Sequence, residues 1–130
     1  MTGALKHILL IESEFYTRVQ LDDDLSPYGF QVTSVKKVRN ALIKLKTQIF
    51  QAIVISYDDD VETPLRLLAT LRHIFNQSPV LVLAKRPTEA QLMQLMRYKP
   101  VEVMVKPYGL MDMVQRLESL IETAESAKNG

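Results

Sequence analysis

Ala52-Ile53-Val54-Ile55 is a run of four apolar residues that ends at Ser56. Three further runs of this kind occur, at His7–Ile11, Val80–Leu83 and Val101–Val105. Short, nearly continuous runs that are rich in valine and isoleucine are typical of strands buried on both faces of a parallel sheet. A fifth segment, Phe30–Val35, alternates apolar and polar residues, which predicts an edge strand with one wetter face.

Segments with the helical spacing of apolar residues lie between and after these runs. They cover Phe15–Leu25, Val38–Leu45, Leu65–Ile74, Thr88–Met96 and Leu110–Ile121. Strict alternation of strands and helices implies right-handed crossovers and a sheet covered on both faces. We therefore predict a three-layer α/β domain built from five strand–helix units.

The size and composition of the chain fit one such domain. A chain of 130 residues with 47% apolar and 24% charged residues is an ordinary globular sequence. We expect a single domain over residues 1–130, with its core at about 7–121. Residues 122–130 are polar and are predicted to form a solvated tail or linker.

The charge pattern argues against two classes of partner. The net charge is +1 and the basic residues look scattered along the sequence, whereas nucleic acids and acidic membranes are bound by clustered positive charge. We expect no direct nucleic-acid contact and no membrane contact. The chain has no cysteine, no signal-peptide pattern and no apolar run of membrane-spanning length, and we expect a cytoplasmic location.

Polar residues follow the predicted strands at the edge where ligands bind in parallel α/β sheets. They are Glu12-Ser13-Glu14, Ser56-Tyr57-Asp58-Asp59-Asp60, Ala84-Lys85 and Lys106-Pro107-Tyr108. Because the carboxyl ends of parallel strands meet at one edge of the sheet, we expect any functional site there. A nucleotide site is disfavoured, since the turn after the first strand has no glycine and carries carboxylates where an anion would sit.

From about His7 to Ile121 the chain resembles the receiver domain of bacterial response regulators (CheY-like). Val103-Met104-Val105-Lys106-Pro107-Tyr108 is similar to the last strand of that family and its Lys-Pro-aromatic sequence. Ile8–Glu14 is similar to the first strand and its acidic cluster. Counting forward from Ser56, the apolar stripe and Leu-Arg pair of the third helix fall without a gap on Leu65, Leu67, Leu68, Leu71 and Arg72. The resemblance implies the flavodoxin-like strand order 2-1-3-4-5 and places Ser56 at the phosphoryl-acceptor position.

The resemblance also implies which chemistry the chain has lost. Receivers accept a phosphoryl group on an aspartate, with Mg²⁺ and a lysine neutralising the charge. Here Ser56 replaces the acceptor, Ser13 replaces a metal-binding acid, and Ala84 replaces the hydroxyl residue after the fourth strand, while Lys106 is retained. We therefore predict a non-enzymatic pseudo-receiver of a two-component phosphorelay, with no cofactor.

Two other interpretations concern the retained charges. Lys106 is predicted to pair with Glu12 in a structural role, and Asp58–Asp60 to form a solvated loop. Alternatively, Asp58 joins Glu12 or Glu14 around a divalent cation such as Mg²⁺ and itself accepts a phosphoryl group. This second reading describes an active receiver with an altered site.

A pseudo-receiver would act through protein contacts. Leu92, Leu95 and Met96 are predicted to pack inward from the fourth helix, which leaves Met93 and Met111 over as adaptable surface residues. The resemblance implies an interaction face on the fourth helix, fifth strand and fifth helix, with candidate residues Leu92, Met93, Met96 and Met111. The implied partners are a histidine kinase, an output domain or another receiver, including a homodimer through this face.

Overall fold

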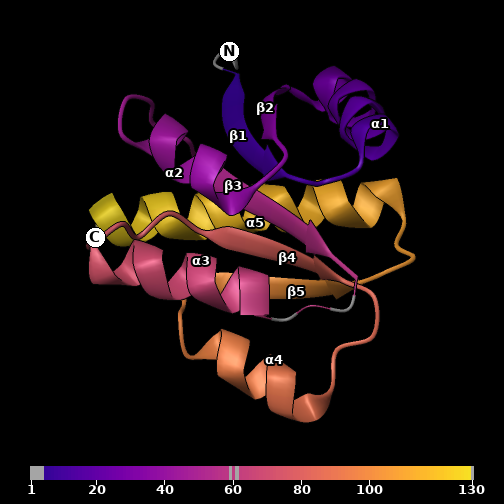
Figure 1. Cartoon of the computed structure of the whole chain (residues 1–130). Helices are drawn as coiled ribbons and strands as arrows, with labels where there is room; N and C mark the ends of the chain where they lie inside the picture. The colour runs from indigo at the N-terminus through magenta and orange to yellow at the C-terminus, as the bar shows by residue number, and fades with distance from the viewer. Residues whose placement is uncertain (1–4, 59, 61, 130) are drawn as a thin grey trace.

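The computed structural model describes residues 5–58, 60 and 62–129. Its sheet has five parallel strands in the order β2-β1-β3-β4-β5, as the sequence predicted (Figure 1). The strands are β1 (Lys6–Ile11), β2 (Phe30–Val35), β3 (Ala52–Tyr57), β4 (Val80–Ala84) and β5 (Val101–Val105). The helices are α1 (Phe15–Leu25), the short 3-10 helix η1 (Ser26–Tyr28), α2 (Val38–Leu45), α3 (Glu62–His73), α4 (Glu89–Met96) and α5 (Leu110–Asn129). No helix in the described residues is long and apolar enough to cross a membrane.

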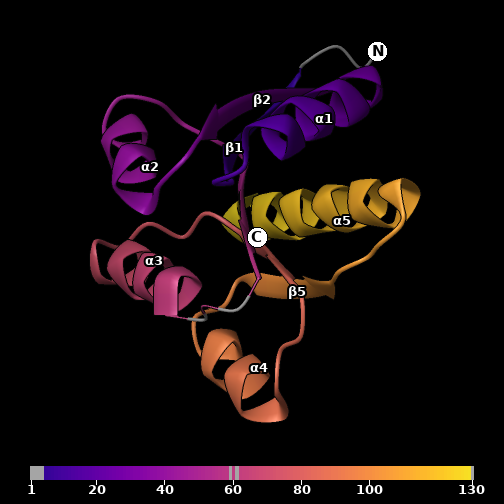
Figure 2. The ribbon, with the colours of Figure 1, turned by 45° about the vertical axis from the view of Figure 1, so that its right-hand side comes forward.

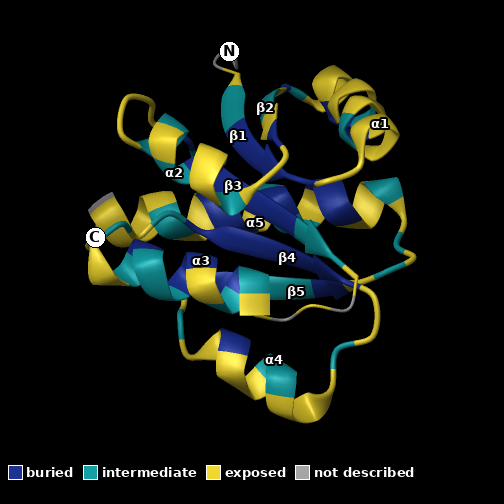
Figure 3. Ribbon diagram, viewed as in Figure 1, coloured by how far each residue is buried: buried dark blue, intermediate teal, exposed yellow. Residues whose placement is uncertain are grey.

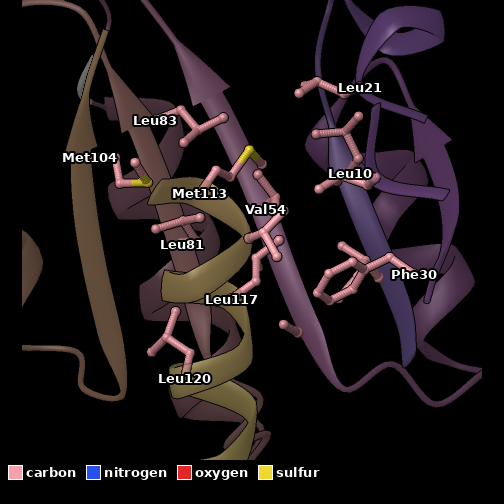
Figure 4. Close-up of a cluster of buried hydrophobic side chains, with 14 of the residues drawn as sticks. Leu10, Leu21, Phe30, Val54, Leu81, Leu83, Met104, Met113, Leu117 and Leu120 are labelled. Carbon is pink, nitrogen blue, oxygen red and sulfur yellow. The ribbon is translucent and has the colours of Figure 1, made fainter. Parts of the chain in front are cut away.

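The helices form two layers, one on each face of the sheet (Figures 1 and 2). On one face Leu10, Val54 and Leu81 pack against Leu21 of α1 and Leu117 of α5, in the cluster shown in Figure 4. A second cluster joins the other face to α2, α3 and α4, through residues that include Ile53, Ala41, Leu68 and Leu95. Successive strand residues enter opposite clusters because side chains alternate across a sheet. Strand β4 is consequently buried throughout, as are Ile8–Ile11 of β1 and Ala52–Ile55 of β3 (Figure 3).

Several element boundaries differ from the sequence prediction. Strand β3 continues through Ser56 to Tyr57, because it pairs with β4 as far as Tyr57 and Ala84. Helix α3 begins at Glu62, three residues earlier than predicted. The carboxylate of Asp60 explains the early start, since it accepts hydrogen bonds from the Glu62 N–H (3.0 Å) and the Thr63 hydroxyl (2.6 Å). Asp60 therefore stabilises a helix start and is not simply part of a solvated loop.

The predicted polar tail is largely helical. Helix α5 continues from Leu110 to Asn129, so that it includes residues 122–129 of the segment expected to be a linker. Most of residues 122–128 are exposed, as the polar sequence predicted. The lack of an apolar stripe in residues 122–129 suggested a linker. The end of α5 does not need such a stripe, because it extends beyond the sheet.

Arg72 joins three segments at the amino-terminal edge of the sheet. Its guanidinium donates hydrogen bonds to the carbonyl oxygens of Tyr98 (2.9 Å), Asn76 (2.9 Å), Ser78 (3.0 Å) and Pro100 (2.9 Å). These carbonyls belong to the α3–β4 and α4–β5 connections. Burial lowers the pKa of Arg72, but the carbonyl oxygens compensate the desolvated charge.

Candidate functional site at the carboxyl edge of the sheet

Most of the residues predicted at the strand ends line one cleft, but Asp60, Ala84 and Lys85 do not line it. Asp59 lies outside the residues that the structure describes. Glu12, Ser56 and Lys106 each lie two residues after a core residue that faces α1 and α5, namely Leu10, Val54 and Met104. The period of two along a strand therefore places all three on that face. The cleft has a volume of about 430 Å³. It is lined by Glu12, Ser13, Glu14, Thr17, Ser56, Tyr57, Asp58, Lys106 and Tyr108.

Glu12 is buried and is held by the local backbone. Its carboxylate accepts a hydrogen bond from the N–H of Glu14 at 2.8 Å. The guanidinium of Arg18 donates hydrogen bonds to the carbonyl oxygens of Glu12 (2.8 Å) and Ser13 (3.1 Å). These bonds hold the turn between β1 and α1. Sequence reasoning did not identify Arg18, although its position one turn into α1 is the signal that would have found it.

Glu14 serves as the N-cap of α1. Its carboxylate accepts hydrogen bonds from the N–H groups of Tyr16 (3.2 Å) and Thr17 (2.8 Å) and from the Thr17 hydroxyl (2.8 Å). The hydrogen bonds to Thr17 lower the pKa of Glu14. Because these bonds already use its oxygen lone pairs, Glu14 is a poor candidate for binding a cation in the cleft.

Lys106 pairs with Asp58 and not with Glu12, which corrects the sequence prediction. Its Nζ lies 3.0 Å from Oδ1 of Asp58. The hydrogen bond and charge of Lys106 lower the pKa of Asp58, with a smaller contribution from the charge of Lys85. The N–H of Glu14 orients the Glu12 carboxylate through Oε2. Asp58, in the loop just beyond β3, lies within hydrogen-bond distance of Lys106 after β5.

The donor set does not fit a divalent cation. In the part of the chain that the structure describes, no group of three or more histidine, cysteine, aspartate or glutamate residues lies close enough to hold a metal ion. Glu12 and Glu14 accept hydrogen bonds from backbone N–H groups, and Asp58 binds an ammonium. Ser13 and Ser56 contribute neutral hydroxyl oxygens, whereas Mg²⁺ is usually held through carboxylates.

Neither histidine lies where it could activate Ser56. His7 is near the start of β1, where its ring packs against Phe50 at a centroid distance of 5.2 Å, and His73 is in the last turn of α3. Both positions are at the amino-terminal edge of the sheet, opposite the cleft. Because an unactivated hydroxyl is a weak nucleophile, Ser56 is not equipped for nucleophilic catalysis.

Tyr57 is a site residue whose role sequence reasoning missed. It packs against the cluster of α2, α3 and α4, and its hydroxyl oxygen is buried without a hydrogen-bond partner among the described residues. Burial raises the pKa of Tyr57. The register pairs Tyr57 with Ala84 and Ala84 with Val105, so that these residues form a row across three strands. The available signal was the period of two that extends from Ile53 and Ile55 to position 57.

The exposure of the residues predicted to form an interaction face is partly as expected. Met93 is 70% exposed, Met111 is exposed, and Leu92 is half-buried. Leu95 is buried as predicted, but Met96 is exposed and does not pack inward. An exposed side chain that the sequence did not single out, Val105 of the edge strand β5, adds apolar surface between α4 and α5. We refer to Leu92, Met93, Met96, Val105 and Met111 as the α4–β5–α5 face.

Comparisons with known proteins show the fold of this chain. No protein-family model matches it, and no curated protein matches its sequence. Full-length FixJ from B. japonicum is similar in structure, with a TM-score of 0.84 and 22% identity over 98% of this chain and 63% of that one. The chain has the receiver-domain fold. The receiver domain of Francisella response regulator 1452 has a TM-score of 0.80 and 18% identity, with 92% of this chain and 98% of that chain covered.

A third similar structure contains a metal. It is the receiver domain of a sensor histidine kinase from Pseudomonas aeruginosa PAO1, with a magnesium ion coordinated in its active-site cleft. Its TM-score is 0.71 and its identity 18%, with 92% of this chain and 99% of that chain covered.

Proposed function

We propose that this chain is a pseudo-receiver, a signalling domain of a two-component system that acts through protein contacts and catalyses no reaction. The supporting observation is that Ser13 and Ser56 line the same cleft as Lys106. The resemblance to receivers places carboxylates at both serine positions. The cleft therefore has the shape of a phosphoryl-accepting site without the two acids that the reaction requires.

The charges in the cleft support the same proposal. In phosphoryl transfer, the oxygens of the transferred group need compensation by cations. The ammonium of Lys106 is already compensated by Asp58, and the donor set fits Mg²⁺ poorly. A protein with these contacts would hold one arrangement of the β3–α3 and β5–α5 loops without phosphorylation. Its signal would depend on which partner is bound, and not on a covalent change.

The partner in this proposal is a protein of the same signalling class, namely a histidine kinase, an output domain or another receiver. The α4–β5–α5 face supports it, since three methionines and a valine are exposed there beside a sheet edge. Methionine side chains adapt readily to the shape of a partner surface.

One observation favours a second candidate, an altered receiver that accepts the phosphoryl group on Asp58. The contact of 3.0 Å between Asp58 and Lys106 places a carboxylate beside one of the two cations that receiver chemistry uses, and a divalent cation would have to supply the other. In that reaction an oxygen of Asp58 would attack the phosphorus of acetyl phosphate, and acetate would leave. The carboxylate of Asp58 is 62% exposed, which makes it accessible to a small phosphodonor.

The deciding experiment is an amide NMR titration of ¹⁵N-labelled protein with Mg²⁺ and then with beryllofluoride or acetyl phosphate. The first proposal predicts that the natural protein does not respond, and that Ser56→Asp shifts signals near residues 56, 84 and 106. Intact mass spectrometry provides a second readout, because an acyl phosphate adds the mass of one phosphoryl group.

Asp58→Asn is the control that separates the two candidates. If the natural protein forms an adduct and Asp58→Asn does not, the pseudo-receiver proposal is wrong and Asp58 is the acceptor. An adduct that survives in Asp58→Asn would contradict both proposals.

A further inference from the structure

The structure shows a charge segregation that the sequence appeared to lack. Residues 36–51 contain five basic residues and no acidic one, although the net charge of the whole chain is only +1. This segment is α2 with its flanks, and its basic residues are Lys36, Lys37, Arg39, Lys44 and Lys46. Five of the 16 basic residues of the chain therefore lie in and around α2, in a segment that has no acidic residue to offset them.

Exposed apolar side chains lie among these cations. Ile43 of α2 is 58% exposed, and Ile49 in the following loop is 89% exposed. The opposite side of α2 packs into the sheet through Ala41, Leu42 and Leu45. We call Arg39, Ile43, Lys46 and Ile49 the basic α2 face, in which exposed apolar and basic side chains occur together. Arg39 and Ile43 are four residues apart and Lys46 follows three residues later, so these three share one side.

Helix α1 presents the opposite charge around a similar apolar centre. Leu21 and Leu25 are its buried residues, while Tyr16 is 77% exposed and Val19 is 44% exposed. Asp22 and Asp23 are exposed one turn after Val19, at positions that share its side of the helix. We call Tyr16, Val19, Asp22 and Asp23 the acidic α1 face.

The two faces belong to opposite layers of the domain. Leu21 of α1 packs in the cluster with α5, whereas Ala41 of α2 packs in the cluster with α3 and α4 (Figure 2). The helices accordingly lie on different sides of the β2–β1 edge, with their exposed faces directed outward. One molecule cannot bring its own two faces together, but two molecules can.

We propose that copies of this chain associate head to tail, with the acidic α1 face of one copy against the basic α2 face of the next. Charge complementarity supports a second copy as the occupant, since Asp22 and Asp23 would meet Arg39 and Lys46 around a centre formed by Val19 and Ile43. Because the contact joins two different faces, each assembly has one free acidic α1 face at one end and one free basic α2 face at the other. The assembly therefore grows as an open chain unless its rotation closes a ring. This contact is separate from the α4–β5–α5 face and does not depend on phosphorylation.

Salt dependence gives the first test of the proposal. Sedimentation of the natural chain is compared in about 0.01 M and about 0.15 M NaCl, where the Debye length is roughly 30 Å and 8 Å. We expect a weight-average mass that rises with protein concentration at low salt and rises less at the higher salt. A mass equal to that of the monomer at every concentration and at both salt levels would overturn the proposal.

Two blocking variants and their mixture test the head-to-tail geometry. Ile43→Asp places an acid in the basic α2 face, and Val19→Lys places a base in the acidic α1 face, so each variant alone is expected to stay monomeric. The mixture still has one intact face of each kind. It should form a one-to-one dimer of twice the monomer mass and nothing larger. A mixture that stays monomeric while the natural chain associates would contradict the proposal.

Met93→Asp is the matched control for Ile43→Asp, because it places an acid at an exposed position of the α4–β5–α5 face. We expect this variant to associate like the natural chain. Loss of association in Met93→Asp alone would assign the contact to the α4–β5–α5 face and overturn the proposal. Flotation with phosphatidylserine vesicles covers the remaining possibility. The proposal would be wrong if the natural chain stayed monomeric and bound these vesicles while Ile43→Asp did not. The basic α2 face would then be a binding surface for anionic lipid.

Discussion

The ammonium of Lys106 and the carboxylate of Asp58 form an ion pair of 3.0 Å that joins the end of β5 to the loop after β3. The resemblance to receivers implies that Lys106 is a retained site residue and that its partner lies two residues beyond the acceptor position at Ser56. The pair closes one side of the cleft, with Ser56 within the same lining.

The first prediction concerns the strength of this pair. Because the Asp58 carboxylate is 62% exposed, Asp58→Asn is expected to lower the free energy of unfolding by less than about 1 kcal/mol at neutral pH. A double-mutant cycle with Lys106→Met in urea measures the coupling. Since the pKa of Asp58 is lowered in the folded state, its contribution should be present above the ordinary aspartate pKa and be lost as the pH falls through the folded value. A coupling several times larger would mean that the pair is shielded from solvent.

The second prediction concerns Arg72. Arg72→Met removes the donor from the carbonyl oxygens of Tyr98, Asn76 and Ser78, while that of Pro100 keeps the N–H of Val80. The substitution is expected to cost roughly 2–4 kcal/mol of unfolding free energy. Arg72→Lys should rescue little, because a single ammonium cannot reach carbonyls arranged around a planar guanidinium. Arg66→Met, at an exposed position of the same helix, is the control and should change stability by less than about 0.5 kcal/mol. Equal effects at positions 66 and 72 would refute the role assigned to Arg72.

The third prediction concerns the hydroxyl of Tyr57. A buried polar atom without a partner is costly, so Tyr57→Phe is expected to keep or raise the stability, by up to about 1 kcal/mol. Thermal unfolding by circular dichroism measures the change. A clear loss of stability in Tyr57→Phe would show that the hydroxyl has a hydrogen-bond partner, such as a bound water.

The fourth prediction concerns high pH. Burial raises the pKa of Tyr57, and burial with the charges of Glu12 and Asp24 raises the pKa of Tyr108. A raised pKa means that the folded state holds the proton more tightly. The stabilisation is therefore present below the ordinary tyrosine pKa of about 10 and is lost as the pH rises through the folded values. Urea unfolding between about pH 9 and pH 11 should show falling stability, and Tyr57→Phe with Tyr108→Phe should reduce the slope. An unchanged slope in the double variant would contradict the assignment.

The fifth prediction concerns the end of α5. Removal of residues 122–130 deletes mainly exposed residues, so the shortened domain is expected to fold with a modest loss of stability. Its far-ultraviolet circular dichroism should lose signal equivalent to about two turns of helix. A signal that does not change would show that residues 122–129 are not helical in solution.

The sequence by itself determined the fold class and the edge of the sheet where the site lies. Short runs such as Ala52–Ile55 are typical of central parallel strands, and their alternation with helical segments indicates a sheet that is covered on both faces. That Ser13 and Ser56 replace acids is what the resemblance to receivers implies. Local patterns sufficed here because periodicity depends on neighbouring residues only.

Tertiary structure alone decided how the charged side chains pair. The sequence pattern predicted Glu12 as the partner of Lys106, and the packing of the loops after β3 and β5 places Asp58 there instead. The role of Arg72 as donor to four distant carbonyls, and the separation of the acidic α1 face from the basic α2 face, likewise depend on which elements pack together. Such contacts join residues far apart in the chain, and their geometry is set by packing in three dimensions. No local pattern of residues carries that information.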